Sequence, residues 1–86
     1  MTEPRTRLDR VALESICDEV RKEVIRARMK HAPMHSAHEG YAVILEEMDE
    51  LWEEVKRQEI DRSAMRDEAL QVAAMAVAFI LEATDD

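Results

Sequence analysis

Apolar residues recur every three or four positions along most of the chain, a spacing that predicts amphipathic helices and no strands. We expect three helices, at residues 7–30, 37–57 and 62–83. The first should begin after Thr6, with Asp9 as an acidic residue at its third position. It should end before Ala32-Pro33, because proline disfavours helix in the preceding residue. The fold class is therefore all-α.

Two further helix starts are marked by polar capping residues. Ser36 followed by Glu39 fits a capping box, in which each residue satisfies a free amide near the start of the helix. Asp61 has the residue type of an N-cap for the third helix, and Ile60 and Met65 could form a hydrophobic staple across it.

The third helix is apolar on every side from Ala69 to Leu81, with Gln71 as the one exception. A helix that is hydrophobic all round needs partners all round. Two other helices of one short chain cannot easily supply them. We therefore expect three helices per chain and a four-helix-bundle-type core completed by oligomerisation, as a homodimer or homotetramer.

Composition and charge limit the function classes. Eighty-six residues fit a single domain, 1–86, and the net charge of −8 argues against nucleic-acid binding, which needs a basic patch. An anionic ligand would require a bridging cation. The single cysteine, Cys17, suggests a reducing compartment, and the longest apolar run, 72–81, is too short to span a bilayer. We expect a cytoplasmic protein with no membrane partner.

Four oxygen-bearing residues occupy matching positions on the second and third helices. Glu47 and Glu50 are three residues apart, as are Glu68 and Gln71, so each pair shares one helix face. In an antiparallel hairpin with its midpoint at residue 59, Glu47 faces Gln71 and Glu50 faces Glu68. The four side chains would form an oxygen-rich site of the kind that a hard divalent cation prefers.

Glutamates on helices are often plain surface charges, but Glu47 lies at the edge of an apolar arc, beside Ile44 and Leu51. An unpaired charge is costly there, and converging carboxylates repel one another unless a cation neutralises them. Oxygen-only ligands favour Mg²⁺ or Mn²⁺ over zinc.

The same residues resemble a known family. Glu46-Glu47-Met48-Asp49-Glu50, followed by Glu68-Ala69-Leu70-Gln71, is similar to the pattern of the MazG-type all-α nucleoside triphosphate pyrophosphohydrolases, Glu-Glu-x-x-Glu and then Glu-x-x-Asp. Helix order and chain size fit as well. Lys30-His31-Ala32-Pro33 closes the first helix and looks like the lysine-plus-aromatic stretch that many members have there.

The resemblance implies hydrolysis of a (deoxy)nucleoside triphosphate to the monophosphate and pyrophosphate, with Mg²⁺ or Mn²⁺ as cofactor. It implies Glu47, Glu50 and Glu68 as metal ligands and Glu46 as the residue that orients or deprotonates the attacking water. The chain departs from the family at Gln71, where the pattern has aspartate. A glutamine oxygen can coordinate a cation but adds no charge. The alternative is therefore a catalytically weak or inactive helical dimer that binds nucleotide or another protein.

Other side chains are candidates for substrate contact. Lys30 and Arg28 are the better phosphate contacts near the end of the first helix, and Tyr41 could stack on a base. Three histidines in the same region are expected to be plain loop residues (His31, His35, His38). Glu19 and Glu23 are expected to be solvent-exposed rather than to supply a ligand from the first helix.

Overall fold

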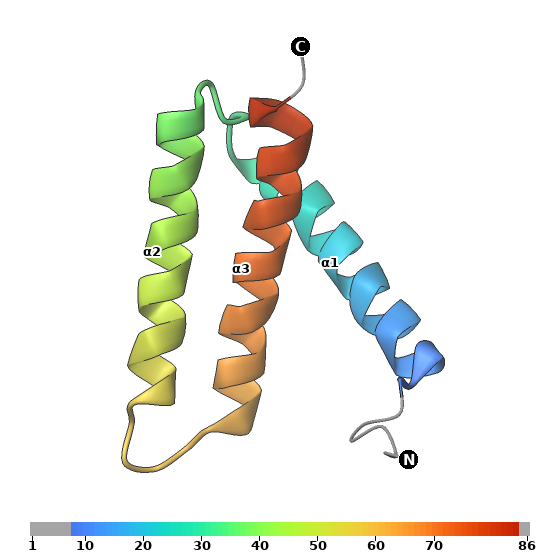
Figure 1. Ribbon diagram of the computed structural model, residues 1–86, viewed down its shortest axis with the longest axis vertical. Coiled ribbons are helices and arrows are strands. Elements are labelled where there is room, and N and C mark those ends of the chain that lie inside the picture. Colours follow the sequence, from blue (N-terminus) through green and yellow to red (C-terminus); the bar gives the residue numbers. More distant parts are fainter. Residues whose placement is uncertain (1–7, 85–86) are drawn as a thin grey trace, which may run out of the picture.

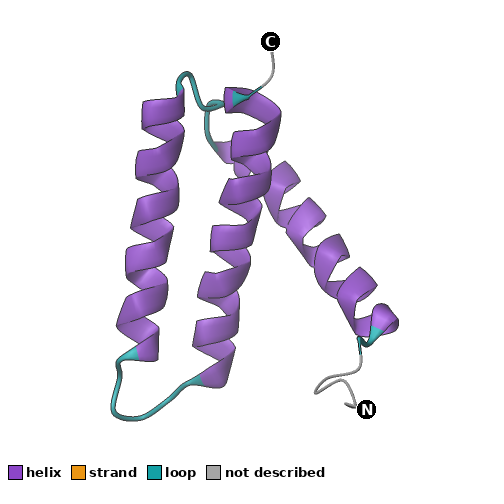
Figure 2. Cartoon of the chain, viewed as in Figure 1, coloured by secondary structure: helices purple, strands orange, loops and turns teal. Residues whose placement is uncertain are grey.

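Three helices account for all the regular secondary structure of residues 8–84, the part of the chain that the computed structural model describes (Figures 1 and 2). They are α1 (Arg10–Lys30), α2 (Ala37–Val55) and α3 (Arg62–Ala83). No strand occurs within these described residues, which confirms the all-α prediction.

Helices α2 and α3 form an antiparallel hairpin, and α1 crosses α3 at an angle (Figure 1). α3 packs against both other helices, whereas α1 and α2 have no Cα atoms within 8 Å of each other. Only the second half of α1 packs closely, through Val20, Val24 and Ala27. Its first half diverges from the hairpin, so Leu13 and Ile16 remain more than 40% exposed.

The helix starts follow the capping chemistry, with one correction. Asp9 is the N-cap of α1, because its carboxylate accepts a hydrogen bond from the Ala12 amide at 3.0 Å. The helix therefore begins at Arg10 and not at residue 7, and Thr6 lies outside the described residues. The predicted cap of α3 is confirmed: the Asp61 carboxylate accepts from the Ala64 amide at 3.0 Å.

The capping box of α2 is also present, in a slightly shifted form. The Ser36 hydroxyl accepts from the Glu39 amide at 3.0 Å, as predicted. The Glu39 carboxylate reaches back to the amide of His35, at 2.9 Å, one residue before the N-cap. At its other end α2 stops at Val55, two residues earlier than expected, because the chain turns at Lys56 towards α3.

The core is small and lies where α2 meets the C-terminal half of α3. Its buried members are Met34, Ala74, Met75 and Ala78. Gly40 belongs to the same region. A Cβ atom at Gly40 would stand 2.6 Å from Cδ2 of Phe79, closer than real carbon atoms approach. This glycine therefore allows the two helices to pack closely.

Much of the apolar surface is left uncovered in the single chain. Cys17 is exposed, because it lies on the diverging half of α1. On α3, Ile80 and Leu81 are about 60% exposed. Within residues 8–84, none of the helices combines the length and the hydropathy needed to cross a membrane.

Candidate functional site

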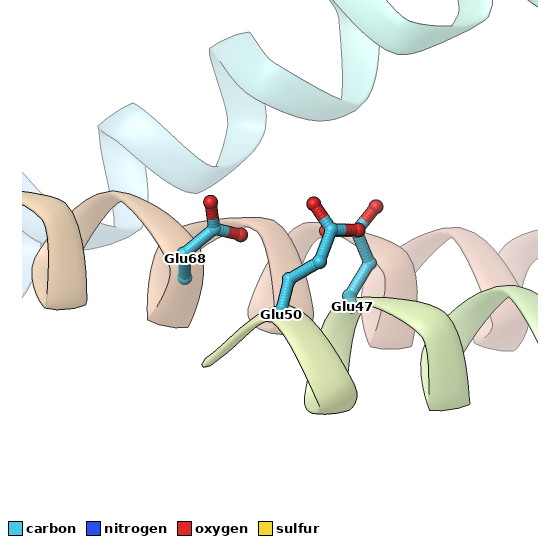
Figure 3. A group of neighbouring side chains, drawn as sticks. All are labelled: Glu47, Glu50 and Glu68. Carbon is cyan, nitrogen blue, oxygen red and sulfur yellow. The ribbon is translucent and has the colours of Figure 1, made fainter. Parts of the chain in front are cut away.

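Three glutamates from two helices meet at the centre of the hairpin. Glu47 and Glu50 come from α2 and Glu68 from α3, and each offers a carboxylate oxygen that lies within 4.8 Å of the others. Their carboxyl groups point to the same side of the hairpin, the side on which α1 crosses (Figure 3). The structure thus brings together three of the four residues proposed as metal ligands, in the register that the antiparallel arrangement predicts.

Burial and like charge disfavour ionisation of two of these glutamates, Glu47 and Glu68. The pKa of Glu47 is raised, mainly because burial removes water from its carboxyl group, and further by the charges of Glu50 and Glu68. Burial likewise raises the pKa of Glu68, with Glu50 as the next cause. A cation among these oxygens would remove the repulsion, since it attracts all three carboxylates.

Gln71 lies in the same pocket, next to a residue that we expected to face solvent. Glu23, from α1, has a side chain only 15% exposed and lines the pocket together with Gln71 and the three glutamates. Its pKa is lowered first by the Gln71 side-chain amide and, after an opposing effect of burial, by Arg26. The expectation of solvent exposure was wrong for Glu23, because α1 crosses directly over this part of the hairpin.

The acids form one part of a pocket of about 630 Å³ between the three helices. Basic side chains from the end of α1 and the loop after it form another part, and include Arg26, Lys30 and His31. Arg26 also pairs with Glu23, with an N–O distance of 3.2 Å. The pocket therefore contains both carboxylates for a cation and positive charges for an anion.

The three predicted substrate contacts have different surroundings. Lys30 lines the pocket and is exposed. Arg28 also lines it, but its guanidinium is ion-paired with Glu82. Tyr41 is 64% exposed and is not among the residues that line the pocket.

The candidate for the catalytic role, Glu46, lines the pocket from α2 and is exposed to solvent. Its charge is among the smaller causes of the raised pKa of Glu47. Of the histidines, His31 lines the pocket, whereas His35 lies 3.7 Å from the Glu39 carboxylate.

No protein-family model, curated protein or solved structure matches this chain. A function is therefore inferred from the geometry of the pocket and from the sequence pattern.

Glu23 was expected to face solvent although the sequence carries a signal for its burial, and Arg26 was not among the predicted site residues. Glu23 falls between Val20 and Ala27, three and four residues away on the same face of α1. An acid inside an apolar stripe is the pattern that singled out Glu47. Arg26 carries no such signal, because its position depends on the crossing angle of α1.

Proposed function

We propose that this chain is a metal-dependent nucleotide pyrophosphohydrolase, which converts a (deoxy)nucleoside triphosphate to the monophosphate and pyrophosphate. The observation that carries the proposal is the three-carboxylate group in a pocket that also contains basic side chains. A cation and a polyphosphate need these two features together. A volume of about 630 Å³ also falls within the range of pockets for small-molecule ligands.

The donor set fits Mg²⁺ or Mn²⁺. All three groups are carboxylates, which hard cations prefer, and Mg²⁺ is commonly held by one or two carboxylates together with substrate phosphates. Glu47, Glu50 and Glu68 would hold the ion, and Gln71 could add an amide oxygen. When bound, such an ion polarises the phosphoryl oxygens and lowers the pKa of a coordinated water.

The protein residues would provide position and charge. A water oxygen bonds to the α phosphorus while the bond from that phosphorus to the bridging oxygen of pyrophosphate breaks. Glu46 would orient the water or take its proton. Lys30 and Arg26 would face the phosphates and offset their negative charge.

The alternative, a weak or inactive nucleotide-binding or protein-interaction module, is favoured by Gln71. The fourth corner of the site lacks a carboxylate on α3, so less negative charge is available to hold the cation. A measurement of turnover separates the two functions, because binding alone would leave nucleotide intact.

We also infer that the chain assembles as a homodimer or homotetramer. Almost half of its residues are hydrophobic, yet only four of the described ones form the buried core. On α2, five exposed side chains follow one another at alternating spacings of four and three residues, which is typical of a seam between helices. They are Tyr41, Leu45, Met48, Trp52 and Val55. We further propose that the protein is cytoplasmic.

The test is a panel of ribo- and deoxynucleoside triphosphates incubated with Mg²⁺ or Mn²⁺, with pyrophosphate measured as product. We expect release from at least one nucleotide, and a loss of more than about 100-fold in Glu47→Gln or Glu50→Gln, since even changes beside metal ligands cost 10–100-fold. Asp49→Asn is the matched control: it removes a carboxylate from the same helix, outside the pocket. Absence of release from every nucleotide with both ions would reject the enzyme.

A further inference from the structure

One ion pair joins the end of α1 to the end of α3. Arg28 and Glu82 are 54 residues apart in sequence, and their side chains are 28% and 17% exposed. All other ion pairs of the described residues but one join side chains three or four positions apart in sequence. The exception, Arg66 with Glu19, links α3 to α1 but is 51% and 40% exposed.

The pair also fixes the backbone between α1 and α2. While Nε and Nη2 of Arg28 donate to the Glu82 carboxylate, Nη1 donates to the carbonyl oxygens of His31 and Ala32, at 3.0 and 2.9 Å. Glu82 Oε1 in turn accepts a hydrogen bond from the Met34 amide at 3.1 Å. The two side chains thus hold three residues of the loop, His31, Ala32 and Met34, at the end of α3.

This loop and the last residue of α1 form a wall of the candidate site. Lys30, His31, Ala32 and Met34 all line the pocket. Met34 is also a buried core residue, and its sulfur lies 3.0 Å from where a Cβ of Gly40 would stand. The loop is therefore held by apolar packing at Met34 and by polar contacts through Arg28 and Glu82.

We propose that the Arg28–Glu82 pair is a positioning device, which holds the end of α1 and the α1–α2 loop so that Lys30 and His31 face the polyphosphate. The donors of Arg28 are directed to Glu82 and the loop carbonyls, so its effect on the substrate is exerted through Lys30 and His31. The consequence for substrate rests on the proposed function; the consequence for the loop does not.

Glu82→Gln is the first test variant, because an amide has nearly the same shape as the carboxylate but removes the charge from the pair. We expect KM for the nucleotide to rise roughly tenfold, equivalent to about 1.4 kcal/mol of binding, with kcat changed less than twofold. Mn²⁺ affinity in the absence of nucleotide should stay the same, since the glutamates that would hold it are on other parts of α2 and α3. Arg28→Lys keeps the charge but loses the planar fork, and we expect an intermediate KM.

The matched control is Glu19→Gln, which breaks the other inter-helix pair away from the pocket. It should leave KM unchanged. An unchanged KM in both Glu82→Gln and Arg28→Lys would overturn the proposal, as would equal effects of Glu82→Gln and Glu19→Gln. If Glu82→Gln does not fold, the decision rests on Arg28→Lys.

A second measurement separates this proposal from the proposed function. Amide hydrogen exchange at Met34 should be faster in Glu82→Gln and unchanged in Glu19→Gln, whether or not the protein hydrolyses nucleotides. If the wild-type chain is inactive but Met34 behaves in this way, the proposed activity fails and the positioning of the loop stands. Unchanged exchange at Met34 in Glu82→Gln would overturn the positioning role itself.

Discussion

At the scale of single residues, the informative feature is an acid placed against apolar neighbours. Glu47 and Glu68 both have raised pKa values, with burial as the first cause. Their ionised forms therefore cost folding free energy in the absence of a cation. Such positions are unfavourable for stability, which is the reason that they point to a ligand.

Glu47→Gln should stabilise the metal-free protein at neutral pH while weakening cation binding. Since the folded-state pKa of Glu47 is raised above the ordinary value of 4.5, its contribution to stability is present below pH 4.5 and is lost as pH rises through the folded-state pKa. Glutamine does not ionise, so the variant does not lose stability in this way as the pH rises. Its Tm should exceed that of the wild type by a few degrees at pH 7, and the difference should vanish near pH 4. Thermal unfolding between pH 4 and 8, with chelator present, measures this.

Added Mn²⁺ provides the complementary result. It should raise the Tm of the wild type and have little effect on Glu47→Gln, because ligands stabilise only the state that binds them. Asp49→Asn should respond like the wild type. An equal response of all three proteins would contradict a cation site at Glu47.

Gln71→Asp should tighten cation binding. One added negative charge about 6 Å from a divalent cation contributes roughly 1.4 kcal/mol even at the dielectric constant of water, or about a tenfold gain in Mn²⁺ affinity. The new carboxylate would also lie beside Glu23 and replace the amide that is the first cause of the lowered pKa of Glu23, so the two carboxylates would repel each other. We accordingly expect a lower Tm without metal, and recovery of that Tm in the double variant Gln71→Asp/Glu23→Gln.

Calorimetric titration measures the change in Mn²⁺ affinity of Gln71→Asp, and thermal unfolding in chelator measures the change in its Tm without metal. Ser63→Asp is the matched control, because it adds the same charge to an exposed position on α3 outside the pocket. Equal Mn²⁺ affinities for wild type and Gln71→Asp would show that residue 71 does not face the cation.

Several residue positions were predictable because they depend on local rules. The three glutamates follow from helix phase and the antiparallel hairpin, which need only neighbouring helices. The surroundings of Arg28 and Arg26 could not be predicted in this way. Both lie on α1, and its angle over α3 is set by packing contacts far apart in the sequence.

At the scale of the helices, the capping residues predicted where α2 and α3 begin. The role of the single glycine, Gly40, became clear only from the packing of α2 against α3. Ser36 and Asp61 cap α2 and α3 as predicted, since a cap involves only the next few residues. The first helix was placed too early because Thr6 and Asp9 are both good caps, and the structure uses Asp9. The role of Gly40 depends on Phe79, 39 positions away, and so required the structure.

Gly40→Ala should destabilise the fold although alanine favours helices. The intrinsic gain is roughly 0.5–1 kcal/mol, whereas forcing a methyl group into a packed site costs about 1–3 kcal/mol. The Cβ would meet the ring of Phe79 at 2.6 Å, so the packing cost should prevail. We expect a lower Tm in thermal unfolding, and partial recovery in Gly40→Ala/Phe79→Leu. A Tm above that of the wild type would show that the two helices can separate without cost.

At the scale of the whole molecule, the apolar surface exceeds what one chain can bury. The apolar face of α2 divides into a side that packs on α3, through Ile44, and an exposed side that carries Trp52. On α3, Ile80 and Leu81 are exposed as well. Large exposed apolar areas mark surfaces for association, and a second copy of the chain is the partner that we propose.

The single tryptophan makes this last prediction measurable. Trp52 is 57% exposed in the isolated chain, so an unassociated protein should show the long-wavelength emission of a solvated indole. If α2 forms the seam, sedimentation at micromolar concentration should give a dimer or tetramer with emission shifted to shorter wavelength. Trp52→Glu should shift the protein towards monomer with reduced helix content, because the exposed stripe would lose its largest side chain and gain a charge. Glu53→Gln, the next residue along the helix, should leave the assembly unchanged. A fully helical wild-type monomer with long-wavelength emission would refute the assembly and require another partner for this surface.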